Sequence, residues 1–351
     1  MSAGGYIATN IHSDKYLDMT NRILTTALAL LSLLLLGGCH PMVYERLDDC
    51  PREVEVLLYS QSPCDAQRTY PADMTSVLLI AYNDRGEVVA TETHKGAVTA
   101  ETRVRMTLPT SDPVRIAAWS GLDEETFDLT PGAKADELFA ALRAGRDLTG
   151  RVIRQGVTEK LSFAPLDKVG TESPTQVSVN LLELTNRITI RLSGLQEPEK
   201  VSMEVTSAND RYSGLGKLLD VRGQSTPYSY PIAIKRKANT YTGKPEPGCI
   251  AEYDGEVTGQ VTTLSLESGH GSLLSIHQEG LSAPIYEQDL VGLVLMAARK
   301  GAHHANLSCD HDFTVELKVR RCPDCSEGYE VAWIKVNDWL VHSVDIELDQ
   351  L

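Results

Sequence analysis

A group of histidines and cysteines near the end of the chain has residue types and spacing that could do chemistry. Cys322-Pro323-Asp324-Cys325 has the C-x-x-C spacing of zinc and redox sites. A zinc site could combine this pair with Cys309 and His311, and His303 and His304 lie just upstream. A thioredoxin-like redox site would need a βαβ context, which the surrounding sequence lacks. Because the motif falls between two expected strands, we favour a disulfide that holds a hairpin turn.

Other polar groups that could act as catalysts or ligands have no evident partners. His270 in Gly269-His270-Gly271-Ser272 has no visible nucleophile partner, so a role in loop structure is favoured. The motifs G-x-S-x-G, H-E-x-x-H and G-x-x-x-x-G-K are absent from the sequence. Asp48-Asp49, Asp84 and Asp123-Glu124-Glu125 could bind calcium, but isolated acidic runs are more often solvated surface. We therefore predict a non-enzymatic protein with no metal, no cofactor and no small-molecule substrate.

Three tryptophans are the remaining candidates for ligand binding. Trp119, Trp333 and Trp339 could bind glycan if their rings were exposed, because an indole ring is flat and apolar with one polar edge. For Trp339, which follows Asn337-Asp338 in a turn, packing over the end of a β-sandwich is the favoured interpretation.

The clearest chemical signal lies at Cys39. Residues 23–36 form an uncharged apolar stretch that is too short for a membrane span of about 20 residues but has the size of a signal-peptide core. Leu36-Gly37-Gly38-Cys39 closes this stretch and resembles the lipobox of bacterial lipoproteins. The resemblance implies cleavage after Gly38 and a lipid on Cys39, with an ordinary secretory signal or a transmembrane anchor as the alternatives. Met19-Thr20-Asn21-Arg22 is a better start for such a leader than Met1, so we predict that translation begins at Met19 or that the extension is cleaved unused.

Length, charge and cysteine count limit the remaining possibilities. Without residues 1–38 the chain is long enough for two domains of about 100–200 residues each. A net charge of −15 argues against a nucleic-acid partner, whose binding needs a basic patch. If Cys39 carries lipid, an even number of cysteines remains, which favours disulfides in an exported chain. Sequence cannot fix their pairing, but proximity suggests Cys50–Cys64 and Cys322–Cys325, which would leave Cys249 for Cys309.

Short segments rich in Val, Ile and Thr predict an all-β fold. Residues 102–108 and 313–320 alternate between apolar and polar side chains, as half-buried strands do. Residues 77–82 are a continuous apolar run that predicts a strand buried on both faces, and Asn83-Asp84-Arg85-Gly86 predicts a hairpin turn after it. Further strands are expected at residues 53–59, 87–94, 114–119, 161–164, 176–182, 184–192, 201–205, 230–234, 261–266, 273–277, 290–296, 331–336 and 341–348.

One segment predicts a helix instead. Residues 131–146 place Ala135, Leu138, Phe139 and Leu142 at helical spacing, after Thr130 as a cap and Pro131 in the first turn. A single helix argues against a parallel α/β sheet and favours tandem β-sandwiches. The predicted organisation is a leader over 1–38, a lipidated tether over 39–51, an N-terminal sandwich over 52–183 and a C-terminal sandwich over 184–351.

Four stretches carry a resemblance to a known family. They are the lipobox with the following Cys50 and strand, residues 77–82 with Asn83 to Val89, residues 184–190, and the terminal Ile334-Lys335-Val336-Asn337-Asp338-Trp339. In this order and spacing they resemble the fimbrial anchor-subunit lipoproteins of Bacteroidales, the FimB-type family of type V pili. The resemblance implies two transthyretin-like Greek-key β-sandwiches, a lipid anchor in the outer membrane at the cell surface, and a place at the base of a fimbria.

The same resemblance implies a partner and a mechanism. A fimbrial stalk subunit would pair with a sheet edge of this protein by strand exchange, and the anchor would also limit fimbrial length. Stalk subunits lose an N-terminal strand by cleavage after an arginine, whereas an anchor should keep its N-terminus. Because Arg46 and Arg52 lie at the expected tether, a tip or stalk subunit is one alternative. A surface lipoprotein that binds glycan through exposed aromatic rings is the other.

Overall fold

The computed structural model describes residues 50–109, 111–164, 173–219, 227–243, 253–299, 306–321 and 328–343. Every described residue belongs to one compact unit, Cys50–Leu351. The expected leader, the cleavage site at Gly38, the lipid site at Cys39, and Cys249, Cys322 and Cys325 lie outside the described residues. Within the described part, no helix is long and apolar enough to cross a membrane.

The first half of the described unit begins with a sheet of three strands in the order β4-β1-β9. Their bounds are β1 (Arg52–Tyr59), β4 (Val104–Leu108) and β9 (Thr175–Asn180). β1 lies in the middle, antiparallel to β4 and parallel to β9. Alternate side chains of β1 and β4 are buried, which confirms the period-2 pattern expected for residues 102–108.

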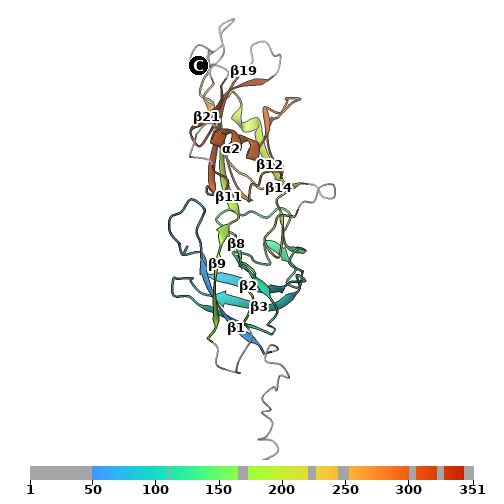
Figure 1. The fold of residues 1–351 in the computed structure, drawn as a ribbon. Coiled ribbons are helices and arrows are strands. Elements are labelled where there is room, and N and C mark those ends of the chain that lie inside the picture. Colours follow the sequence, from blue (N-terminus) through green and yellow to red (C-terminus); the bar gives the residue numbers. More distant parts are fainter. Residues whose placement is uncertain are drawn as a thin grey trace, which may run out of the picture. The chain divides into compact units, whose positions relative to one another are not determined.

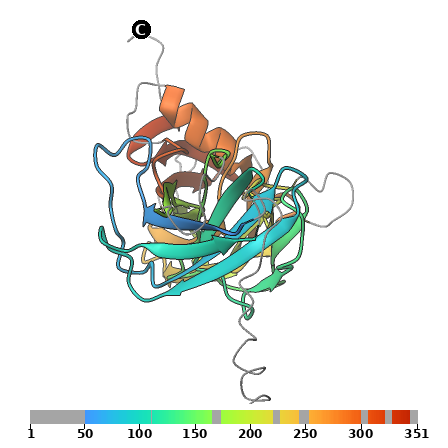
Figure 2. The same ribbon diagram turned by 60° about the horizontal axis from the view of Figure 1, so that its bottom comes forward.

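A second sheet, in the order β10-β8-β5-β2-β3, packs against the first (Figures 1 and 2). Its strands are β2 (Ser76–Asn83), β3 (Val88–Lys95), β5 (Val114–Ser120), β8 (Arg154–Val157) and β10 (Leu182–Glu183). Leu79 and Ala81 of β2 enter one hydrophobic core with β1 and β4, whereas Ile80 and Tyr82 enter the other core. This confirms the prediction that residues 77–82 form a strand buried on both faces.

The hairpin turn predicted after β2 is confirmed. The Asn83 side-chain oxygen accepts hydrogen bonds from the backbone N–H groups of Arg85 and Glu87, each at 2.9 Å. Gly86 adopts a φ of +75°, a conformation that only glycine reaches without strain. The turn therefore depends on the two residue types that the sequence singled out.

A third small sheet, β13-β7-β6, covers the second face of β5. It contains β6 (Phe127–Leu129), β7 (Leu138–Leu142) and β13 (Arg211–Ser213). The Trp119 ring of β5 lies 5.4 Å from the ring of Phe139 and 6.1 Å from that of Tyr212, measured between centroids. Since β13 comes from the second half of the chain and β7 from the first, this sheet joins the two halves.

The helix predicted over residues 131–146 is wrong, because this segment contains strand β7. Phe139 and Leu142 are buried as expected, but in an extended segment that pairs with β6 on one side and β13 on the other. Helical spacing of apolar residues reports only a local preference, and pairing with two strands distant in sequence overrides it.

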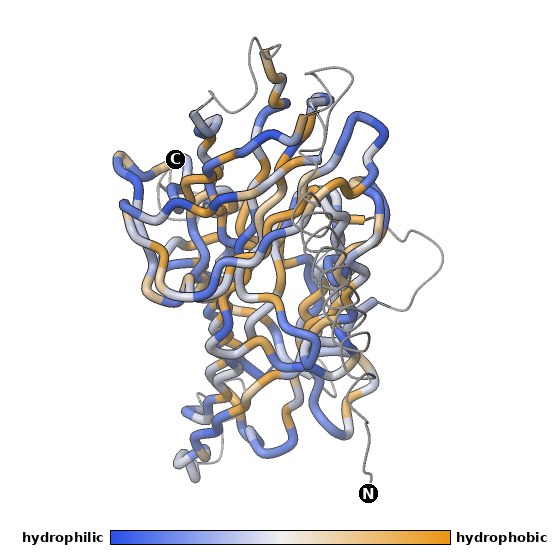
Figure 3. The backbone as a smooth tube through the Cα atoms, turned by 90° about the horizontal axis from the view of Figure 1, so that it is seen from below, coloured by the Kyte–Doolittle hydropathy of each residue, from blue (hydrophilic) through white to orange (hydrophobic). Residues whose placement is uncertain are grey.

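The second half is built from two further sheets with the orders β15-β16-β11-β19-β20-β21 and β14-β12-β17-β18. β11 is antiparallel to β16 and parallel to β19, and a short 3-10 helix, η2 (Pro198–Lys200), precedes β12. Along the tube in Figure 3, hydrophobic and hydrophilic residues alternate within many strands, as in sheets with one buried face. The strands are β11 (Thr185–Leu195), β12 (Val201–Ser207), β14 (Tyr228–Tyr230), β15 (Ala233–Lys237), β16 (Gly255–Leu264), β17 (Ser272–Gln278), β18 (Tyr286–Asp289), β19 (Asp312–Arg321), β20 (Tyr329–Val336) and β21 (Trp339–Ser343).

The strand predicted over residues 290–296 is also wrong, because the segment forms the helix α2 (Leu290–Arg299). Leu290, Leu293, Val294 and Ala297 are buried at helical spacing. The Asp289 carboxylate accepts a hydrogen bond of 2.6 Å from the backbone N–H of Gly292, which caps the first turn. A continuous apolar run does not distinguish a buried strand from a buried helix, and here the cap and the packing decide.

Candidate functional site

A disulfide between Cys64 and Cys309 ties the two halves of the described unit together. Their Cα atoms are 5.8 Å apart, although the two residues are separated by 245 positions in the sequence. Cys64 lies in the segment between β1 and β2, and Cys309 lies just before β19. The bond therefore connects the strand that begins the first half to a central strand of the second half.

The pairing predicted from sequence proximity is wrong on two counts. Cys64 pairs with Cys309, so neither Cys50–Cys64 nor Cys249–Cys309 forms. Cys50 is a buried free thiol just before β1, whereas Cys64 follows the other end of that strand. An eight-residue strand spans about 26 Å, far beyond the roughly 7 Å limit between the Cα atoms of a disulfide. The expected Cys322–Cys325 bond remains a prediction.

The disulfide also removes one ligand from the zinc alternative. Cys309 has no free thiolate to offer, which leaves His311 as the other described residue of the proposed ligand set. Among the described residues, no group of three or more His, Cys, Asp or Glu side chains could hold a metal ion. Cys322 and Cys325 lie outside these residues.

Asn180 fastens the segment after β1 to the end of β9. Its side-chain oxygen accepts a hydrogen bond of 2.9 Å from the Gln61 N–H, and its amide nitrogen donates one of 2.8 Å to the Gln61 carbonyl. Next to this pair, the Leu181 N–H donates to the Tyr59 carbonyl at 2.8 Å. One side chain thus satisfies both backbone groups of a residue near the disulfide, as a neighbouring strand would.

Asn186 makes a similar fastening on the other side of the disulfide. This buried side chain donates to the Asp310 carbonyl at 3.4 Å and accepts from the Leu266 N–H at 2.8 Å. The Arg187 N–H then donates to the His311 carbonyl at 2.6 Å, where the ladder between β11 and β19 begins. The two residues that follow Cys309 are therefore held against the start of β11.

Charged side chains make hydrogen bonds and ion pairs on both sides of the disulfide. The Arg187 guanidinium donates to both Asp312 oxygens, at 2.7 and 3.0 Å, and to Glu183 at 2.6 Å. The hydrogen bonds from Arg187 lower the pKa of Asp312 below its ordinary value. On the other side, hydrogen bonds from Ser62 lower the pKa of Asp65, with a smaller contribution from His311. Both carboxylates therefore stay ionised into the acid range.

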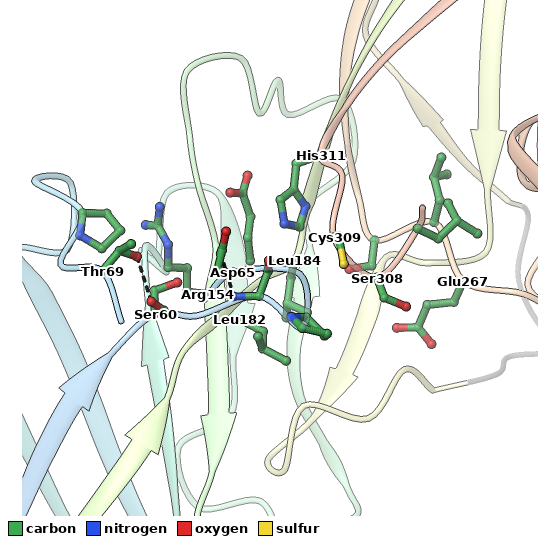
Figure 4. A pocket seen from close by; sticks show the side chains of 17 residues that line it. Ser60, Asp65, Thr69, Arg154, Leu182, Leu184, Glu267, Ser308, Cys309 and His311 are labelled. Carbon is green, nitrogen blue, oxygen red and sulfur yellow. Dashed lines mark hydrogen bonds between the residues drawn. The ribbon is translucent and has the colours of Figure 1, made fainter. Parts of the chain in front are cut away.

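A cavity of about 520 Å³ lies beside the disulfide, lined by residues of both halves (Figure 4). Its charged groups have mixed signs, because Asp65 and Glu267 face it together with Arg154 and His311. Arg154 is buried and makes an ion pair of 2.8 Å with Asp73. Burial raises the pKa of Glu267. Acidic and basic groups line the cavity together with apolar side chains such as Leu182 and Leu184, so its lining favours no single ligand class.

The other residues that the sequence singled out do not converge on this site. Trp119 is 1% exposed and donates from its indole nitrogen to the Gly214 carbonyl at 3.1 Å, so it cannot serve as a glycan platform. Trp333 is half-buried beneath the Lys335 ammonium, and half-buried Trp339 packs against the core as expected. Asp84 pairs with Lys160, and Asp123 pairs with Arg151. His270 lies in a turn, where its backbone N–H donates to the Glu267 backbone carbonyl at 3.1 Å.

Arg52, a candidate cleavage point, is buried at the start of β1. It is 3% exposed and donates to the Ala164 carbonyl at 3.1 Å, and its backbone lies opposite Leu108 of β4. Arg46 lies outside the described residues. Sequence reasoning missed Asn180 and Asn186, because isolated asparagines carry no signal before their distant partners are known.

The described residues define a class of protein, an all-β protein with two hydrophobic cores and a covalently tied junction between its halves. A comparison with protein families makes the class specific. The chain belongs to the family of fimbrillin-A associated anchor proteins Mfa1 and Mfa2, whose model matches residues 47–345. This confirms the resemblance to fimbrial anchor subunits that the sequence suggested.

Individual relatives agree with the family. The chain is 27% identical over 321 residues to the minor fimbrium anchoring subunit Mfa2 of Porphyromonas gingivalis, covering 89% of this chain and 92% of that protein. The solved structure of the fimbrial anchor protein Mfa2 from that organism matches with a TM-score of 0.71 and 24% identity, covering 84% of this chain and all of that one. A candidate adhesin from Bacteroides thetaiotaomicron matches with a TM-score of 0.61 and 16% identity, over 83% of this chain and 97% of that one. These structures share the all-β fold of this chain.

Proposed function

We propose that this protein anchors fimbriae to the outer membrane as a structural lipoprotein subunit. The family and the similarity to an anchoring subunit support a non-enzymatic fimbrial role in the cell envelope. A lipid on Cys39 would hold the N-terminus in the membrane, and the second half would pair with a fimbrial stalk subunit. A multiply acylated cysteine provides stable anchoring, since one acyl chain alone binds membranes only marginally.

The position of β1 is the observation that most favours an anchor over a stalk or tip subunit. β1 lies between β4 and β9 and forms a hydrogen-bonded ladder with each. Val54, Val56 and Leu58 of this strand are buried in the core. The segment that follows the proposed lipid site is therefore an interior strand of the sheet, and removing it would expose a core. A subunit that keeps this strand therefore stays covalently joined to the proposed lipid on Cys39.

The same position suggests the direction of strand pairing. Since β1 occupies the place between β4 and β9, that place is closed to a strand from a neighbour. We therefore propose that this protein donates a segment to the stalk subunit. Its C-terminal residues alternate Val344, Ile346 and Leu348 with acidic residues, a pattern suited to a groove with one apolar face.

Deletion of the gene, followed by imaging of fimbriae on cells and in the medium, tests the anchoring role. Anchoring predicts fimbriae shed into the medium or altered in length, and the Cys39→Ala variant should reproduce this effect while the body still folds. A chain truncated after Ser343 should remain in the membrane but release fimbriae. Normal attachment of fimbriae in the deletion strain would overturn the proposal.

A further inference from the structure

We infer that the Cys64–Cys309 disulfide is a mechanical tie, which passes tension from β1 directly into β19 and bypasses the chain between the two cysteines. The inference rests on the proposed anchoring function, because an anchored subunit is pulled between its lipid-bound end and the end that pairs with the stalk. The bypassed segment covers 245 positions of the sequence. It includes most of the first half and much of the second, so the tie would lower the force that the covalent chain between the two cysteines has to carry.

Two covalent routes run side by side through the junction. The main-chain route leaves β9 at Asn180, passes β10 and enters β11 at Thr185. The disulfide route leaves β1 at Tyr59, reaches Cys64, crosses to Cys309 and enters β19 at Asp312. Each route therefore connects one strand of the β4-β1-β9 sheet to one strand of the six-stranded sheet.

The directions of the strands suit tension along these routes. β1 is parallel to β9, so both strands run toward the junction. β11 is parallel to β19, so both strands run away from it. A pull between the N-terminus and the C-terminal end of the chain is directed along both pairs. The hydrogen bonds of each ladder lie across this direction and would have to shear together, whereas bonds at a peeling end break one at a time.

The two routes are also fastened to each other on both sides of the disulfide. Asn180 holds Gln61 through two hydrogen bonds on the side of the first half. Asn186 and Arg187 hold Asp310 and His311 on the side of the second half. A force that stretches one route is therefore passed to the other route before the two halves separate.

The local surroundings fit a mechanical role. Cys64 is exposed and Cys309 is half-buried, so the bond is not part of a hydrophobic core. The Asn306 amide lies 3.7 Å from the Cys64 sulfur, and the Asn306 N–H donates to the Asp310 carboxylate at 2.6 Å, which braces the segment that carries Cys309. These contacts hold the disulfide in place between the two sheets and leave it partly exposed.

Pulling the exported chain by its two ends in a single-molecule experiment tests the tie directly. With the disulfide intact, the segment between the two cysteines should add nothing to the end-to-end length of the chain, even after complete unfolding. The double variant C64S/C309S should lengthen the fully extended chain by about 800–900 Å, which is 245 residues at roughly 3.3–3.6 Å each. It should also yield at a lower force. Equal extension or equal force in both proteins would overturn the inference.

A cell experiment separates the tie from simple stability. Cells with C64S/C309S should keep fimbriae in still culture but lose several-fold more of them than wild type under fluid shear. The control is Leu79→Ala, a truncation in the core between the first two sheets, chosen because it lowers thermal stability without touching the tie. If stability alone mattered, both variants would shed alike, and that result would overturn the inference. A gene-deletion strain that retains its fimbriae would instead overturn the anchoring function.

Discussion

Asn180 and Gln61 share two hydrogen bonds where β1 and β9 end side by side, although they lie 119 positions apart in the sequence. The Asn180 side chain satisfies the backbone N–H and carbonyl of Gln61, as a neighbouring strand would. Gln61 lies in the short segment between the end of β1 and Cys64. This relationship places the start of the disulfide route against the end of β9.

Removal of the disulfide should lower stability. The double variant C64S/C309S frees a loop spanning 245 positions in the unfolded chain, and loss of a native disulfide of this kind costs about 2–5 kcal/mol. Guanidinium unfolding followed by circular dichroism should show a lower midpoint. Wild-type protein treated with a dithiol reductant should approach the midpoint of the variant, and an unchanged midpoint in both would contradict the prediction.

Truncation of the Asn180 side chain should also destabilise the protein. Asn180→Ala leaves the N–H and the carbonyl of Gln61 without their partner, and each lost hydrogen bond costs about 0.5–1.5 kcal/mol. Gln176→Ala in the same strand is the matched control, because its side chain is exposed and makes a hydrogen bond of 3.4 Å to Glu55. Similar unfolding midpoints for the two variants would argue against the fastening role of Asn180.

The ion pair between Arg187 and Asp312 should produce a pH-dependent contribution to stability. The pKa of Asp312 is lowered in the folded state, mainly by the hydrogen bonds from Arg187. A lowered pKa contributes stability above the unfolded value near 3.9, and this contribution is lost as the pH falls through the folded value. Asp312→Asn should therefore destabilise at pH 7, by no more than about 0.5–1 kcal/mol for a pair of this exposure.

The difference between wild type and Asp312→Asn should disappear at low pH. Thermal unfolding measured between pH 7 and pH 2 checks this, with the exposed Asp136→Asn as a control that removes the same charge elsewhere. A difference that persists unchanged into the most acidic samples would show that the loss comes from packing and not from the ionised carboxylate.

The bond after Arg52 should resist an arginine-specific protease in the folded protein. Arg52 is 3% exposed and its strand is paired on both sides, so cleavage requires local unfolding of β1. Mass spectrometry after limited digestion should find residues 52 and 53 still joined, and denatured protein should be cut there. Rapid cleavage at this bond in folded protein would argue against an anchor that keeps its first strand.

Local patterns in the sequence determined much of the fold. The period-2 alternation of residues 102–108 and 313–320 defines β4 and β19, since half-buried strands need it. Asn83 and Gly86 specify the β2–β3 turn through a side-chain cap and a positive φ. The order of such segments was enough to indicate an all-β fold and the fimbrial anchor family, which the family match confirms.

Tertiary structure alone decided the choices that local patterns leave open. Residues 138–142 became a strand because β6 and β13 pair with them, and residues 290–299 became a helix because the Asp289 cap and the core favour it. The partner of Cys64 depended on where the β1 and β19 strands meet, which no spacing in the chain reports. Contacts between residues more than a hundred positions apart have no local signal, because their energy is gained only when the sheets are assembled.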